Sequence, residues 1–272
     1  MIQENNKNEL EVLGYSERGV VNSLIYEILY SNNSIDILQK FIRQIKLVDG
    51  STLNFNVQNA KIFIEQTLSQ FGDPDLFLLI DDKLTDENVK KYIIFFEAKA
   101  CQHKNWQISK QFEEFENGLT THRKNYSSNL FIQLFFKTLF FKKLKNTEEN
   151  QLQTIQVEEE LRVLTNRLLI KNRYARKIGK NKTVIEAVRR MKYYADNALF
   201  IMVIPETECN MKQFFKDNKN KIETLLKCNI KNWGYITWEQ IEKFCQENQL
   251  TKTMGVFSFN GQQIYKKSKN RS

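Results

Sequence analysis

Proline and glycine are scarce in this chain of 272 residues, which contains 2 prolines and 9 glycines. No stretch rich in glycine, serine or proline separates two halves, and no internal repeat is present. Long apolar runs are also lacking, since none reaches the roughly 18 residues needed to cross a bilayer. The first twenty residues are polar and acidic, so no secretory signal is expected. These absences favour a cytoplasmic protein of one domain, residues 1–272, without a membrane partner.

Residues that bind soft metals are few as well. The four cysteines are scattered, no C-x-x-C pair occurs, and the two histidines are His103 and His122. A zinc site built on Cys101 and His103 would lack its other ligands. Buried free thiols are the better interpretation of the cysteines.

Aromatic residues and positive charge, by contrast, are abundant. The hydrophobic fraction is 41%, with 20 Phe and 10 Tyr, which is enough for a sizeable core. The net charge is +9, but residues 119–195 alone carry 17 Lys and Arg against 6 Glu and no Asp, a net of +11. The remainder is therefore about −2. A basic segment attracts polyanions, either nucleic acid or anionic lipid, and charge alone does not choose between them.

Hydrophobic periodicity predicts an α/β fold, a small mixed sheet flanked by helices. A first helix is expected from Ser16 onward, and residues 35–47 are ambiguous between helix and strand. Strands are expected at 61–68, 76–80, 91–96, 199–204 and 235–237, with a hairpin turn at 81–88. Further helices are expected at 105–117, which Gly118 would end, and at about 126–145, 156–170, 183–195, 211–227 and 238–246.

Two acidic segments flank the expected hairpin. Asp75 follows Pro74 and opens one apolar strand, while Glu97-Ala98-Lys99 closes the next. An antiparallel hairpin would place Asp75 beside Glu97. Because side chains alternate along a strand, Glu97 and Lys99 would share one face while Ala98 points into the core. Two carboxylates and one amine are thus expected to converge at one edge of the sheet.

Such a cluster suits phosphodiester hydrolysis. Carboxylates bind Mg²⁺ or Mn²⁺, and the backbone carbonyl of Ala98 could be a further ligand. Lys99 would orient or deprotonate the attacking water and stabilise the developing charge. The alternative is that Glu97 and Lys99 form a surface ion pair and that Asp75 only shapes a turn after proline. An acidic residue two positions before a lysine occurs elsewhere only at 81–83 and 217–219, both in polar stretches.

The pairing of Pro74-Asp75 with Glu97-x-Lys99 resembles the signature of the PD-(D/E)xK, or restriction-endonuclease-like, nuclease superfamily. The order of elements from Ser16 to Ile204 is similar to the family core of helix, three strands, helix and strand. The resemblance implies that Asp75 and Glu97 bind the metal and that Lys99 is the catalytic lysine. It also implies a Mg²⁺-dependent DNA endonuclease of restriction, defence or repair that acts as a homodimer. Residues 119–195 depart from the minimal fold as a basic helical insertion.

Other acidic residues could join the site. Glu17 falls on the apolar face of the first helix, where an unpaired carboxylate is costly. Members of the resembled family often supply an acidic residue from this helix, so Glu17 is a candidate catalytic residue; a contact with the helix dipole is the alternative. Glu65, in the preceding strand, could play the same part.

The insertion offers a candidate nucleic-acid surface. Five basic residues lie within ten positions and interleave with Tyr174: Arg173, Arg176, Lys177, Lys180 and Lys182. Lysine and arginine contacts to phosphate give affinity without sequence information. The alternative is a solvated face of an amphipathic helix. The Phe-rich run 130–144 is expected to pack on the core or on a partner. A nucleic-acid-binding module without catalysis, an RNA-directed nuclease and a membrane-surface scaffold remain alternative functions.

Replacing Arg173, Arg176 and Lys177 with Ala tests the basic segment. We expect weaker binding to unrelated duplex sequences alike, because side chains that bind phosphate do not read bases. The slope of log affinity against log salt should become shallower by about one for each phosphate that the variant no longer neutralises. Fluorescence anisotropy over a salt series measures both quantities. An unchanged salt slope would mean that these side chains only solvate a helix.

Overall fold

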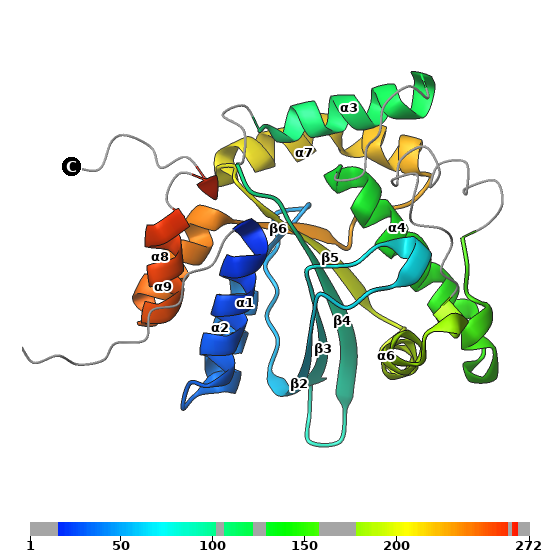
Figure 1. Ribbon diagram of the computed structural model, residues 1–272, viewed down its shortest axis with the longest axis horizontal. Coiled ribbons are helices and arrows are strands. Elements are labelled where there is room, and N and C mark those ends of the chain that lie inside the picture. The colour runs from blue at the N-terminus through cyan, green and yellow to red at the C-terminus, as the bar shows by residue number, and fades with distance from the viewer. Residues whose placement is uncertain (1–15, 102–105, 122–128, 158–177, 261–262, 266–272) are drawn as a thin grey trace, which may run out of the picture.

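Six strands form one mixed sheet in the part of the chain that the structure describes, residues 16–101, 106–121, 129–157, 178–260 and 263–265 (Figure 1). The structure is a computed structural model. The strands are β1 (Lys46–Leu47), β2 (Val57–Ile64), β3 (Leu76–Lys83), β4 (Val89–Ala98), β5 (Ala198–Ile204) and β6 (Trp233–Thr237). Their order across the sheet is β1-β6-β5-β4-β3-β2.

The sheet combines two kinds of pairing. β2, β3 and β4 form an antiparallel meander, whereas β4, β5 and β6 run parallel to one another. β1 pairs antiparallel with β6 at the far edge. The chain therefore crosses over between β4 and β5, and the connecting helices are available to cover the sheet.

Alternation along the strands divides the interior into two apolar layers. In β3, Phe77 and Leu79 belong to one buried cluster, and Leu78 and Ile80 belong to the other. All seven residues of β5 are buried. Continuous apolar runs of this kind are expected when helices cover both faces of a sheet.

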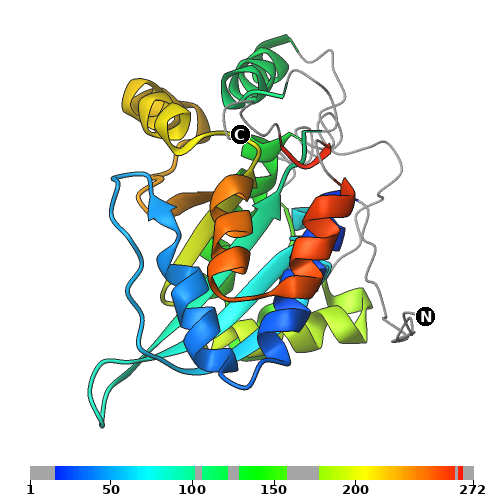
Figure 2. The same cartoon turned by 90° about the vertical axis from the view of Figure 1, so that its left-hand side faces the viewer.

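The helices divide between these two faces (Figures 1 and 2). One face is covered by α1 (Ser16–Leu29), α2 (Ser34–Arg43), α8 (Trp238–Glu247) and α9 (Thr251–Asn260). The other is covered by α3 (Ile108–Thr121), α4 (Leu130–Asn146), α6 (Lys182–Lys192) and α7 (Glu208–Leu226). Within the described ranges, the named 3-10 helices are η1 (Ser69–Phe71), η2 (Glu149–Thr154) and η3 (Ile178–Lys180).

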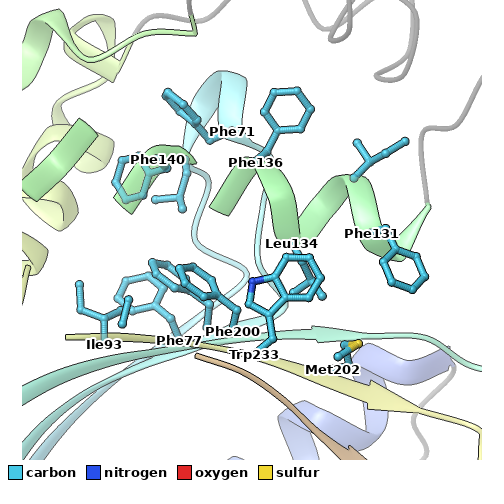
Figure 3. Packing of buried hydrophobic residues seen from close by; sticks show 14 of the residues in the cluster. Phe71, Phe77, Ile93, Phe131, Leu134, Phe136, Phe140, Phe200, Met202 and Trp233 are labelled. Carbon is cyan, nitrogen blue, oxygen red and sulfur yellow. The ribbon is translucent and has the colours of Figure 1, made fainter. Parts of the chain in front are cut away.

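The Phe-rich helix α4 belongs to the core of this second face (Figure 3). It begins after Asn129, whose side chain accepts hydrogen bonds from the backbone amides of Phe131 and Ile132 in the first turn of the helix. The Phe140 ring lies 5.3 Å from that of Phe71 and 6.5 Å from that of Phe95, centroid to centroid. Thr138 accepts a hydrogen bond from the indole of Trp233 in β6. The aromatic run therefore packs on the core of its own chain.

Most predicted elements are present, with shifted ends. The ambiguous segment 35–47 is a helix followed by the two-residue strand β1. The strand predicted at 61–68 begins earlier and ends at Ile64. The first hairpin strand, β3, extends into the predicted turn at 81–88 as far as Lys83, and β4 begins directly after that turn, at Val89. Gly118 does not end α3, which continues to Thr121; α9 was not predicted. The helix predicted at 156–170 lies almost wholly outside the described residues.

Two predictions about composition can also be compared with the structure. In the described part of the chain, no helix combines the length and apolar character needed to span a bilayer. All four cysteines are free thiols; Cys101 and Cys245 are buried, as expected, whereas Cys209 is exposed. The prediction of buried thiols is therefore wrong for Cys209, which lies in the first turn of α7.

Candidate active site

The register of the central hairpin places the two predicted carboxylates opposite each other. Leu76 in β3 pairs with Phe96 in β4, so the next position outward sets Asp75 against Glu97. Neighbouring odd-numbered residues of both strands, such as Phe77 and Phe95, face the layer that contains α4. Asp75 and Glu97 therefore project toward the same face, at the end of the sheet where β3 begins and β4 ends.

Asp75 is fixed by one backbone and one side-chain donor. Its Oδ2 atom accepts a hydrogen bond of 2.8 Å from the backbone amide of Ala98. Its Oδ1 atom accepts one of 3.2 Å from Nε of Arg18, which reaches over from α1. The residue is only 5% exposed. Asp75 is thus a buried, oriented carboxylate, which a simple turn former after proline would not be.

Glu97 is more deeply buried, at 2% exposure, and contacts two ammonium groups. Its Oε1 atom lies 3.0 Å from Nζ of Lys99, and its Oε2 atom lies 3.0 Å from Nζ of Lys137 in α4. The contact with Lys99 is a hydrogen bond. The contact with Lys137 is an ion pair whose atoms are not aligned as a hydrogen bond.

Lys99 has a fixed backbone and a terminal amine that lies between two of the predicted metal ligands. Its amide donates to Val203 in β5, and its carbonyl accepts from the indole of Trp238 in α8. Its Nζ atom lies 3.0 Å from Glu97 Oε1 and 3.0 Å from the carbonyl oxygen of Ala98. Two oxygens predicted to bind a metal therefore already hold a cationic group.

The electrostatics of the two carboxyls differ because their neighbours differ. Burial, followed by the negative charge of Glu97, raises the pKa of Asp75 to about 6; Lys99, the Ala98 amide and Arg18 oppose this shift only in part. Burial also acts to raise the pKa of Glu97, but Lys137 and Lys99 outweigh it and hold that pKa below its usual range. Glu97 is thus ionised at neutral pH, and Asp75 ionises near pH 6.

The donor set fits a hard divalent cation. It consists of the carboxylates of Asp75 and Glu97 and the backbone carbonyl of Ala98. The amide of Ala98 donates to Asp75. Because the amide and the carbonyl of one strand residue point to the same side of the strand, the Ala98 carbonyl also points toward Asp75. Among the described residues, no group of three or more His, Cys, Asp or Glu side chains could hold a metal ion. Mg²⁺ does not need such a group, because it is commonly bound through one or two carboxylates completed by water and substrate phosphate.

The two additional acidic candidates do not complete a third-carboxylate site. Glu65 lies beside Asp75, since its amide donates to the Asp75 carbonyl, but its side chain binds Arg18 and Asn22 of α1. Glu17 has a buried Oε2 atom without a hydrogen-bond partner, on a helix that covers the opposite face of the sheet. In the part of the chain that the structure describes, neither carboxylate forms a group of three acidic metal ligands with Asp75 and Glu97.

The predicted nucleic-acid surface falls largely outside the described residues. Arg173, Arg176 and Lys177 lie there, and the side chain of Lys180 is not described. Lys182 is exposed and begins α6. The proposed role of these five residues therefore stays a prediction from charge.

Sequence reasoning missed two members of the cluster, Arg18 and Lys137. Arg18 is adjacent to the candidate Glu17, but helical periodicity says nothing about how far an arginine reaches past the end of its helix. Lys137 carries the only charge between Leu130 and Phe141. A lone lysine in an apolar helix usually needs a buried counter-charge, so the sequence did contain a signal for it.

Comparison with known proteins adds no assignment to this geometry: no protein-family model matches the chain, and no curated protein or solved structure matches it significantly.

The raised pKa of Asp75 predicts a pH-dependent stability. The carboxyl ionises near pH 3.8 when unfolded and at about 6 when folded, so ionisation favours unfolding. This destabilisation is absent below about pH 4 and complete above about pH 6, where it amounts to roughly 3 kcal/mol. Asp75→Asn removes it. We expect the variant to melt near the wild-type temperature at pH 4 and several degrees higher at pH 8.

Thermal unfolding in EDTA at both pH values measures this difference. Asp86→Asn is the control, because the Asp86 side chain is 92% exposed in the turn between β3 and β4. A gap between Asp75→Asn and wild type that is equal at pH 4 and pH 8 would contradict the raised pKa.

Proposed function

We propose that this protein is a Mg²⁺-dependent nuclease of the PD-(D/E)xK type that cleaves DNA internally. The observation that carries the proposal is the convergence of Asp75, Glu97 and Lys99 on one face at the ends of two paired strands. A surface ion pair and a turn residue would not require two buried carboxylates, nor the bond from the Ala98 amide to Asp75.

Each residue has a definable task in this proposal. Asp75 and Glu97 would hold the metal together with the Ala98 carbonyl, and their strands fix the spacing of these oxygens. A bound Mg²⁺ supplies the charge that polarises the scissile phosphate and makes a nearby water more acidic. Lys99 would leave Glu97 Oε1 and the Ala98 carbonyl, and its amine would orient the attacking water or stabilise the developing negative charge.

Arg18 is suited to contact the substrate. Its guanidinium binds both Asp75 and Glu65, yet its side chain is 49% exposed. Arginine recognises phosphate with two parallel donors, so Arg18 could exchange one carboxylate partner for a phosphate oxygen. Its positive charge also reduces the repulsion between the carboxylates of Asp75 and Glu65.

The architecture supports the same proposal. The described chain contains helix α1, the meander β2-β3-β4, helix α3 and then strand β5, with α2 and the two-residue strand β1 added between α1 and the meander. This order agrees with the helix, three strands, helix and strand of the resembled core. In that interpretation residues 119–195 are an insertion, but α4 within it packs against the sheet and supplies Lys137 to the site.

Nucleic acid is the substrate class that the charge favours. The excess positive charge of residues 119–195 suits a polyanion, and the site faces the layer that contains α4, a helix of this segment. Double-stranded DNA is the proposed substrate, and a homodimer would provide the two active sites needed to cut both strands. RNA cleavage, or nucleic-acid binding without cleavage, are alternative outcomes of the experiment below.

Cleavage assays with plasmid, linear duplex, single-stranded DNA and RNA test the proposal. We expect the wild-type protein to convert supercoiled plasmid to nicked and linear forms with Mg²⁺ but not with EDTA. Asp75→Ala and Glu97→Ala should lose cleavage and Mn²⁺ binding together. Lys99→Ala should lose cleavage by about 10²–10⁴-fold while still binding Mn²⁺, because the lysine acts on the water rather than on the ion.

Lys83→Ala is the matched control. It removes the lysine of Asp81-Asp82-Lys83, which has the same spacing at the opposite end of β3 and pairs with Asp86 in the turn. It should cleave like wild type. Metal-independent cleavage, or cleavage that survives Glu97→Ala, would refute the assignment; binding without cleavage would favour the non-catalytic alternative.

A further inference from the structure

Lys137 is a buried lysine that no sequence motif assigns to the site. It lies in the middle of α4 and is 1% exposed, and its neighbours along the chain include the buried Phe136 and Phe140. An ammonium group in such surroundings is costly unless an opposite charge compensates it. The compensating charge is Glu97, whose Oε2 atom lies 3.0 Å away.

The loop before the Asp75 motif also approaches this amine. Gly72 adopts a φ of +83°, and a Cβ atom built there would lie 3.2 Å from Nζ of Lys137. Glycine at this position lets the backbone turn and leaves space beside the ammonium. Lys137 therefore lies between the loop that leads to one carboxylate and the side chain of the other.

The two lysines that share Glu97 differ in their freedom to move. The side chain of Lys99 is 12% exposed at the end of β4, so its amine has a route away from Oε1. The side chain of Lys137 is 1% exposed and belongs to α4, whose apolar residues are part of the core. Only the Oε1 side of Glu97, next to the Ala98 carbonyl, can therefore be freed without repacking the core.

We propose that Lys137 is a positioning residue, a permanent cation that holds Glu97 Oε2 and limits the site to a single divalent ion on the Oε1 side. This inference rests on the proposed function, because it concerns a metal held by Asp75 and Glu97. In two-metal sites carboxylates serve both ions, which lie about 3.5–4 Å apart. Here the ammonium of Lys137 takes the place of the second cation.

The charges around the two carboxylates predict the direction in which metal affinity changes when Lys137 loses its charge. Three cationic groups, Arg18, Lys99 and Lys137, already contact the two carboxylates. Removing a fixed positive charge a few ångströms from a divalent ion removes a repulsion that is only weakly screened in a buried site. Because Lys137 also lowers the pKa of Glu97, the gain in ion binding is expected at a pH where Glu97 stays ionised in the variant, and the titration below is made there. A residue that merely filled space in the core would change thermal stability but not ion affinity.

Mn²⁺ titration of the full chain, followed by electron paramagnetic resonance of the free ion, tests the proposal without using cleavage. We expect wild type to bind one Mn²⁺ per chain. Lys137→Met keeps the length and apolar stem of the side chain but removes its charge, and should raise the affinity at least about tenfold. Lys137→Arg, which keeps the charge, should remain within about threefold of wild type.

Lys142→Met is the matched control, with the same substitution on an exposed position of the same helix, and should leave the affinity unchanged. A folded Lys137→Met protein with unchanged or weaker Mn²⁺ affinity would overturn the proposal. If that variant does not fold, two Mn²⁺ ions per wild-type chain, both absent in Glu97→Ala, would overturn it equally.

The two proposals can fail separately. A protein that binds Mn²⁺ through Asp75 and Glu97 and cleaves DNA, but whose affinity ignores Lys137→Met, would remove only the role of Lys137. A protein that binds one Mn²⁺, more tightly in Lys137→Met, but cleaves no nucleic acid would remove only the nuclease activity.

Discussion

The antiparallel register between β3 and β4 is the constraint on which the rest of the molecule depends. It pairs Leu76 with Phe96 and so divides alternate residues of both strands between two apolar layers. A slip by one residue would exchange these layers and bury every side chain on the wrong face. The same register sets Asp75 opposite Glu97, so a strong packing constraint also determines the geometry of the candidate site.

Burying the carboxylates of Asp75 and Glu97 costs free energy, and neighbouring cations offset this cost more fully for Glu97 than for Asp75. Glu97 has two lysine partners and remains ionised, whereas Asp75 has weaker compensation and a pKa raised to about 6. Buried ion pairs contribute little net stability, but breaking one leaves an uncompensated charge that is strongly destabilising. An arrangement of this kind is more typical of a site maintained for chemistry than of one selected for stability.

The sequence predicts the local parts of this arrangement well. Asp75, Glu97 and Lys99 emerge from short-range rules: apolar runs define two strands, a polar turn joins them, and alternation puts Glu97 and Lys99 on one face. The ends of elements are harder to predict. Gly118 suggests the end of a helix, but α3 continues through it to Thr121. A strand of two residues, such as β1, is too short to show a periodicity.

The parts that sequence reasoning misses depend on tertiary packing. Lys137 is 40 positions from Glu97, and only the packing of α4 on the sheet brings the two together. The reach of Arg18 to Asp75 and Glu65 depends in the same way on how α1 meets the end of the meander. Glu17 lies in a helix that periodicity predicts correctly. That helix covers the opposite face of the sheet, yet Arg18 of the same helix reaches Asp75, so a role for Glu17 in the site stays a prediction.

Anomalous diffraction of Mn²⁺ in crystals of the wild-type protein shows directly whether Asp75 and Glu97 hold a metal ion. We expect one strong peak at roughly 2–2.6 Å from oxygens of Asp75, Glu97 Oε1 and the Ala98 carbonyl. The amine of Lys99 should have moved from its position between Glu97 and Ala98, while Lys137 still contacts Oε2. A peak elsewhere in the molecule, with Lys99 still bound to both oxygens, would contradict a metal site at Asp75 and Glu97.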